Sequence, residues 1–342
     1  MLKRETKIRK TLNYLIRVVI IAVTYGFIYY QVFYKHRPEE IIHSVESILN
    51  NRQVWALMGL VLGLMILNWG LESFKWKLLI SKIEKVSFFR AYKAVLTGVS
   101  VSLFTPNRTG DYLGRVFILD KGSHVEGILL TLVGSLAQLV VTLSVGLFSL
   151  LLFTDQYLCL LYKFHGYLFA GLILIIPIVV FFLLVIYFKI GLLSDFLSRY
   201  FPGKWANLIK YTAIFSRFSS RELLWNLLLS LARYFVFSIQ FLLLLKLSGA
   251  YIPLQQGLVL VPVIYLIMAG VPSIALADLG IRGSVSLYVL GLYFSANAAG
   301  SPVPDISILA ASTLLWLINL IVPAILGTLF VFNLKFFRNN SR

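Results

Sequence analysis

Long uninterrupted apolar segments constrain this chain more than any other feature of its sequence. Hydrophobic residues make up 59% of the 342 residues and charged residues only 13%, which is far from the usual balance of a soluble domain. The apolar segments recur along the chain and run for about 20 residues, the length that an α-helix needs to cross the hydrocarbon core of a bilayer. We therefore expect an all-α integral membrane protein.

Six of these segments are predicted to be full transmembrane helices. They cover residues 12–33, 54–73, 124–153, 166–188, 222–247 and 305–333. The first follows a basic N-terminus, as in a signal peptide. Its apolar stretch lacks a small-residue cleavage site, so we interpret it as a retained signal anchor.

The net charge of +17 is explained by membrane topology. Lys and Arg cluster beside the spans at alternate helix ends, as the positive-inside rule describes. This pattern places both termini in the cytoplasm of a multi-pass plasma-membrane protein, and it favours attraction to anionic lipid head groups over nucleic-acid binding. Residues 189–221 are basic and repeat apolar side chains at helical spacing, which predicts a helix lying in the cytoplasmic interface.

Two further apolar segments are interrupted by charged breaks that contain glycine. Residues 106–115 read PNRTGDYLGR and residues 272–283 read PSIALADLGIRG, so each break contains Pro, then Asp, then Leu-Gly, then Arg. Irregular backbone at membrane depth is tolerated where protein or a watery cavity surrounds it. We predict one re-entrant helical hairpin over residues 88–119 and a second over residues 256–294.

The two predicted hairpins occupy matching places in two halves of the chain. Residues 54–153 form the first repeat and residues 222–333 the second, and the helix at 166–188 links them so that the second repeat is upside down. Inverted repeats of this kind bring broken helices together near the membrane midplane. The predicted fold is a single transmembrane domain over residues 1–342, with six full helices and two re-entrant hairpins arranged as an inverted repeat.

The breaks supply the candidate binding site, because ionisable side chains at membrane depth are costly and by default mark function. Free N–H groups at the start of a half-helix favour an anion, and the planar fork of arginine suits phosphate. The predicted substrate-binding residues are Arg108, Asp111, Arg115, Asp278 and Arg282, with Asn107 and Thr109. The predicted backbone and hinge residues are Pro106, Gly110, Gly114, Pro272, Gly280 and Gly283.

The two aspartates have a second interpretation. Asp111 and Asp278 each precede an arginine by four residues, so they can form ion pairs with Arg115 and Arg282 that hold the hairpins together. The interpretations overlap, because a carboxylate can also hold an arginine ready for phosphate. If transport is coupled to an ion, the same aspartates are the candidate proton carriers.

Other polar residues in the spans are less specific. Gln138, Arg233 and Gln240 either face the cavity or form interhelical hydrogen bonds. Glu72 lies near a cytoplasmic helix end, as does Glu126, and we interpret both as solvated at the interface. Lys75 belongs to the basic belt that follows the second span.

Catalysis and cofactors have little support in the sequence. It contains no Gly-rich phosphate loop, no H-E-x-x-H and no G-x-S-x-G motif, and we predict no metal site. The single cysteine, Cys159, excludes an internal disulfide and a cysteine zinc site. An active site wholly inside the bilayer, with Asp111 or Asp278 as base, is the alternative that stays open.

The residues of the two breaks resemble a known family, the transmembrane regions of lysylphosphatidylglycerol synthases, also called flippase-like domains. The similarity lies in LFTPNRTGDYLGR at 103–115, in GVPSIALADLGIRG at 270–283 and in FKWKLL at 74–79, and it covers about residues 10–335. The resemblance implies an all-helical fold with re-entrant elements and a role in lipid translocation. Better-understood members flip aminoacylated phosphatidylglycerol.

The sequence departs from the family pattern in two respects. The C-terminal aminoacyl-transfer domain of the full-length synthases is not in this sequence, so we do not expect the chain itself to make lysylphosphatidylglycerol. Its second break has Ala277-Asp278 before Leu-Gly, where glycine is commoner in the family.

The leading expectation is a lipid flippase or transporter that moves an anionic or phosphate-bearing lipid between leaflets through a midplane cavity. One alternative is a membrane-embedded glycosyl- or acyl-transferase acting on polyprenyl-phosphate-linked substrates. Another is a non-catalytic scaffold of an envelope-synthesis complex. The expected partners are membrane lipids with anionic head groups, a second copy of the chain, or an envelope-synthesis protein.

Overall fold

The structure is a computed structural model, and it contains long helices throughout the part of the chain that it describes. The described residues are 52–103, 105, 108–120, 123–158, 166–200, 210–271, 275–297 and 305–331. The predicted first span at 12–33 lies outside them, as do Pro106, Asn107 and Pro272. No strand occurs within the described residues, which confirms the all-α fold class.

Six described helices are long and apolar enough to cross a membrane. They are Val54–Ile80, His124–Tyr157, Phe169–Phe188, Ser220–Leu247, Asp278–Ala296 and Asp305–Phe330. Five of them correspond to spans predicted from the sequence. The sixth, Asp278–Ala296, was expected to be one arm of the second hairpin.

The helices of the spans agree closely with the predicted boundaries. They are α3 (Arg52–Ile80), α6 (His124–Phe153), α8 (Gly166–Phe188), α11 (Ser220–Leu247), and the continuous α14 (Asp305–Trp316), η5 (Leu317–Ile321) and α15 (Val322–Val331). The π-helical turn η3 (Thr154–Leu158) extends α6. The helix α3 continues seven residues beyond its predicted end at residue 73, because Lys75 and Trp76 are buried in the bundle.

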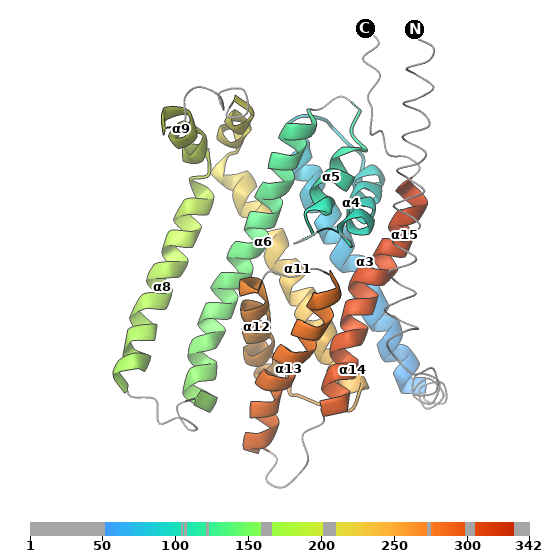
Figure 1. Cartoon of the computed structure of the whole chain (residues 1–342), viewed down its shortest axis with the longest axis vertical. Coiled ribbons are helices and arrows are strands. Elements are labelled where there is room, and N and C mark those ends of the chain that lie inside the picture. The colour runs from blue at the N-terminus through green and yellow to red at the C-terminus, as the bar shows by residue number, and fades with distance from the viewer. Residues whose placement is uncertain are drawn as a thin grey trace.

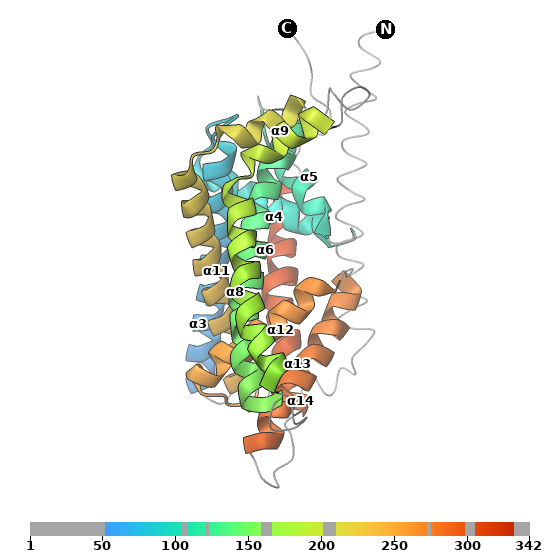
Figure 2. The same ribbon diagram turned by 90° about the vertical axis from the view of Figure 1, so that its left-hand side faces the viewer.

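The broken elements form two helix pairs in different halves of the bundle. The first pair is α4 (Phe88–Ser102) and α5 (Gly110–Val116), and the second is α12 (Leu254–Gly270) and α13 (Ala275–Asn297). In both views the first pair lies in the upper half of the molecule and the second pair in the lower half (Figures 1 and 2). The helices α4 and α5, with 15 and 7 residues, are too short to span a bilayer.

The second pair differs from the predicted hairpin in the length of its returning helix. With 23 residues, α13 is long enough to cross a membrane by itself, whereas α12 has 17. The helix also begins at Ala275, three residues before the expected start at Asp278. The re-entrant hairpins and the inverted repeat stay predictions.

The first pair packs closely, α4 against α5 and α4 against α15. A Cβ atom at Gly114 in α5 would lie 2.6 Å from Gly98 Cα in α4, so these helices need glycine to approach each other. On the side of α15, Ser100 Oγ donates a hydrogen bond to the Ala324 carbonyl at 2.6 Å. The helix α4 is thus fixed between α5 and α15.

The described part of the predicted interfacial segment includes two short helices. They are α9 (Gly191–Tyr200) and the 3-10 helix η4 (Ala213–Arg217). The helix α9 lies across the end of the bundle that also holds α4 and α5 (Figure 1). Its side chains Leu192, Phe196 and Tyr200 are exposed, which is typical of a helix that rests on a membrane surface.

Candidate functional site: an arginine-lined cavity

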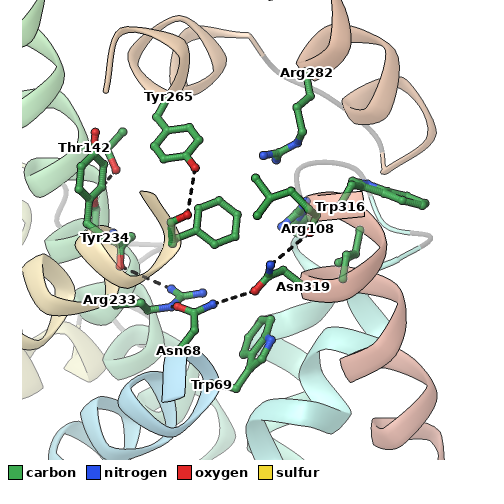
Figure 3. A pocket seen from close by; sticks show the side chains of 14 residues that line it. Asn68, Trp69, Arg108, Thr142, Arg233, Tyr234, Tyr265, Arg282, Trp316 and Asn319 are labelled. Atoms are coloured by element: carbon green, nitrogen blue, oxygen red, sulfur yellow. Dashed lines mark hydrogen bonds between the residues drawn. The ribbon is translucent and has the colours of Figure 1, made fainter. Parts of the chain in front are cut away.

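A cavity of about 220 Å³ lies among the helices and reaches the first break (Figure 3). Its walls come from α3, α6, α11, α12, α13, α14, η5 and Arg108, which lies two residues before α5. The lining side chains are Asn68, Trp69, Arg108, Gln138, Thr142, Arg233, Tyr234, Phe237, Tyr265, Arg282, Leu315, Trp316, Asn319 and Leu320.

The two breaks meet at this cavity although they lie far apart in the sequence. Arg108 Nη2 of the first break is 2.9 Å from Asp278 Oδ2 of the second. Arg282 Nη2 is 3.4 Å from the same carboxylate oxygen. The structure therefore brings together three of the predicted site residues, and two of them, Arg108 and Arg282, line the cavity.

Arg108 reaches the cavity from an unusual backbone conformation. Its φ angle is +56°, and it is the one non-glycine residue with positive φ in the described part of the chain. L-residues rarely adopt this left-handed region, because the side chain crowds the backbone there. The side chain of Arg108 is 45% exposed, so it lies where the cavity opens.

The charged residues of α5 are placed differently. Arg115 donates from Nε to Asp111 Oδ1 at 2.8 Å and from Nη1 to Glu72 Oε1 at 2.7 Å. Arg115 is 4% exposed, and neither it nor Asp111 lines the cavity. The predicted ion pair Asp111–Arg115 is present, and the prediction that these two residues bind substrate stays a prediction.

Glu72 is the centre of a buried ionic cluster, so our interpretation of it as solvated at the interface is wrong. It is 6% exposed and is joined by Lys75 Nζ at 2.8 Å, Arg115 Nη1 at 2.7 Å and Arg233 Nη1 at 3.0 Å. Lys75, assigned to the basic belt, is 2% exposed. Glu126 is partly exposed in the first turn of α6.

Arg233 connects this buried cluster to the cavity. Its Nε donates to Asn68 Oδ1 at 3.0 Å, and its guanidinium lies 5.3 Å from the ring centre of Trp69. Gln138 also lines the cavity, whereas Gln240 makes interhelical hydrogen bonds: it accepts from Asn319 Nδ2 at 2.9 Å. Of the two alternatives left open by the sequence, Arg233 therefore shows both, since it lines the cavity and bonds to α3, whereas Gln240 shows interhelical bonding.

The start of α5 is capped by a residue from the break itself. Gly110 N–H donates to Thr105 Oγ1 at 2.8 Å, while Thr109 occupies the N-cap position without a side-chain cap bond. Because Thr105 accepts this bond, the first N–H of α5 is already used. A Cβ at Gly110 would lie 2.5 Å from the Val101 carbonyl, so this glycine allows close packing of α5 on α4.

The predicted glycines of the second break are less restricted. A Cβ at Gly280 would meet no atom within 4 Å, and one at Gly283 would meet Leu309 Cδ2 at 3.0 Å. Neither position shows the close backbone contact found in the first break. Their predicted hinge role stays a prediction.

The cavity has an excess of hydrogen-bond donors. Trp69 Nε1, Tyr234 O–H and Arg282 Nε are buried and have no hydrogen-bond partner among the described residues. Three arginines line the cavity, and within the described residues no Asp or Glu does. Buried donors without acceptors are costly, so this arrangement favours a ligand that carries acceptor oxygens and negative charge.

A family model supplies the comparison with known proteins. The model described as "Lysylphosphatidylglycerol synthase TM region" matches residues 14–301, which include both breaks and most of the cavity. No curated protein and no solved structure matches the chain. Since the matched region covers far more than half of the 342 residues, this membrane protein belongs to the lysylphosphatidylglycerol synthase TM region family.

Proposed function

We propose that the protein is a lipid flippase or lipid transporter that moves an anionic or phosphate-bearing lipid between leaflets. The observation that carries this proposal is the meeting of Arg108 and Arg282 at a donor-rich cavity between two broken helix pairs. The family's link to membrane lipids supports it.

The size of the cavity fits a head group rather than a whole lipid. At about 220 Å³ it is smaller than the roughly 300–1,000 Å³ of pockets that enclose a drug-sized ligand. The acyl chains would therefore stay in the bilayer while the head group passes through the protein. The exposed apolar face of α8 offers them a surface compatible with lipid: Leu174, Phe181 and Ile186 are each more than 60% exposed.

The distribution of charge supports an orientation in the plasma membrane. The basic residues Lys82, Arg90, Lys189 and Arg217 lie at or just beyond ends of α3, α4, α8 and η4, and these helix ends lie at one end of the bundle (Figure 1). By the positive-inside rule this end faces the cytoplasm. The first helix pair is then on the cytoplasmic side and the second on the outer side.

Leaflet exchange in proteoliposomes tests the proposal. Vesicles containing the full chain and a fluorescent phosphatidylglycerol should exchange the probe between leaflets faster than protein-free vesicles. Arg108→Gln and Arg282→Gln should each slow exchange by roughly tenfold, because each removes a charge-assisted contact with the head group.

The matched control is Arg217→Gln, since Arg217 is exposed in η4 and away from the cavity. This variant should exchange lipid like the wild type. Exchange no faster than in protein-free vesicles for any anionic phospholipid would contradict the proposal. Unchanged exchange in both cavity variants would show that these two arginines do not hold the head group, and product formed from a sugar or acyl donor would favour the transferase.

A further inference from the structure

The charges around the cavity do not cancel. The break group consists of Arg108, Asp278 and Arg282, two cations that share one carboxylate. The Glu72 group consists of Glu72, Lys75, Asp111, Arg115 and Arg233, three cations paired with two carboxylates. Among the described residues, each group therefore carries one positive charge more than it has negative partners.

The two excess charges lie on opposite walls of the cavity. Figure 3 shows Arg233 on one side of the pocket and Arg108 and Arg282 on the other. Arg233 belongs to the Glu72 group, and the two other arginines belong to the break group. An anion in the cavity would thus face one unbalanced charge from each side. Because charges buried in protein are costly without a partner, the pair of excess charges favours a ligand with two negative charges.

The hydrogen-bonding groups point to the same ligand. Arg282 is 8% exposed and reaches into the cavity from α13 (Figure 3), and no described residue bonds to its Nε. The buried donors Trp69 Nε1 and Tyr234 O–H are also unsatisfied. A phosphomonoester has three strong acceptor oxygens and a charge of about −1.5 to −2 at pH 7, because its second pKa is about 6. A phosphodiester has a single negative charge and two non-bridging oxygens.

We propose that the cavity selects lipids whose head group is a phosphomonoester, in preference to phosphodiester lipids and to lipids with a cationic head group. This inference rests on the proposed function and specifies its substrate class. A head group with an added ammonium would meet Arg108, Arg233 and Arg282 with no carboxylate among the described lining residues to receive it. Aminoacylated phosphatidylglycerol is therefore disfavoured in this chain.

A binding competition tests the selection. The purified full chain in detergent is mixed with equal amounts of phosphatidic acid and phosphatidylglycerol that have the same acyl chains, and the bound lipids are counted by native mass spectrometry. Phosphatidic acid should win by roughly tenfold near pH 8, since one more charge-assisted interaction has about that effect on affinity. The preference should shrink several-fold near pH 5, because a phosphomonoester is protonated below about pH 6.

Variants connect the preference to the cavity. Arg282→Gln removes one excess charge, so the preference for phosphatidic acid should fall below about threefold. Arg217→Gln, which changes an exposed charge of η4, should leave it unchanged. Arg108→Gln provides a second variant. The side chain of Arg108 is 45% exposed, so the fold should tolerate the loss of its charge. Thermal unfolding in detergent checks that each variant is folded.

The outcomes separate this inference from the proposed function. Equal binding of the two lipids, or a preference that does not change with pH, overturns the inference even if leaflet exchange is normal. Tight binding of lysylphosphatidylglycerol would also overturn it. If soluble glycerol phosphate competes as well as phosphatidic acid, the ligand is not a lipid. Absence of binding by every phospholipid, together with no leaflet exchange, would overturn both.

Discussion

The two breaks carry the same pattern, an aspartate followed four residues later by an arginine, but their side chains are placed in opposite ways. In the first break Arg115 is bound by Asp111 and Glu72 with short contacts and lies outside the cavity lining. In the second break Arg282 contacts Asp278 at 3.4 Å and lines the cavity, and its Nε has no hydrogen-bond partner in the described part of the chain.

The two breaks also differ in how tightly they are packed. The helix α5 is held against α4 through Gly98 and Gly114, and α4 is bonded to α15. Around Gly280 in α13 there is open space. The difference teaches that one sequence pattern can be placed in two ways: in the first break its arginine is enclosed in a buried ionic cluster, and in the second its arginine lines the cavity.

The largest expected effect is on stability, in the first break. Arg115→Leu leaves Asp111 without its cation and takes one of three cations from Glu72, so the free energy of unfolding should fall by about 3–5 kcal/mol. Arg282→Leu should cost much less, because Asp278 keeps Arg108 at 2.9 Å. Thermal unfolding in detergent measures both. Equal losses for the two variants would remove the distinction between the breaks.

An intermediate effect is expected from adding a methyl group to each break. Gly114→Ala places a Cβ 2.6 Å from Gly98 Cα, and such overpacking should destabilise the protein by about 1–3 kcal/mol. Gly280→Ala meets nothing within 4 Å and should be neutral or stabilise α13 by up to about 1 kcal/mol. The same unfolding assay serves for this pair. If Gly280→Ala is stable but stops leaflet exchange, its predicted hinge role gains support.

The smallest effect concerns the cap of α5. Thr105→Val removes the oxygen that accepts from Gly110 N–H, and loss of a helix cap should cost about 1 kcal/mol. Thr105→Ser retains the hydroxyl and is the matched control. Denaturant unfolding monitored by tryptophan fluorescence distinguishes them. A valine variant as stable as the serine variant would mean that the first break does not depend on its local bonds.

Much of the fold could be predicted from the sequence, because a membrane imposes one requirement on every span. The bounds of α6 and α8 follow from where apolar runs begin and end. The contact between Arg108 and Asp278 agrees with the expectation that the two breaks meet. The length of α13 was missed, since the charges at residues 278 and 282 suggested a short arm rather than the start of a long helix.

The central role of Glu72 could not be read from its position in the chain. A glutamate near a basic helix end can be solvated at the interface or turned inward, and the rotation of α3 decides which. One signal was present: Asn68, Glu72 and Lys75 follow each other at spacings of four and three residues, so they share a face of α3. The partner on α11, Arg233, is 161 residues from Glu72, and only packing brings the two together.

The left-handed backbone of Arg108 affects which amino acid is favoured at this position. A non-glycine residue in the left-handed region costs about 1–3 kcal/mol, and glycine, which adopts a φ of +56° without strain, would remove that cost. The backbone therefore favours glycine here, whereas the ion pair with Asp278 favours arginine. Under the proposed function, an arginine at this position accepts backbone strain in exchange for a guanidinium at the mouth of the cavity, the trade between folding and activity that is expected at a binding residue.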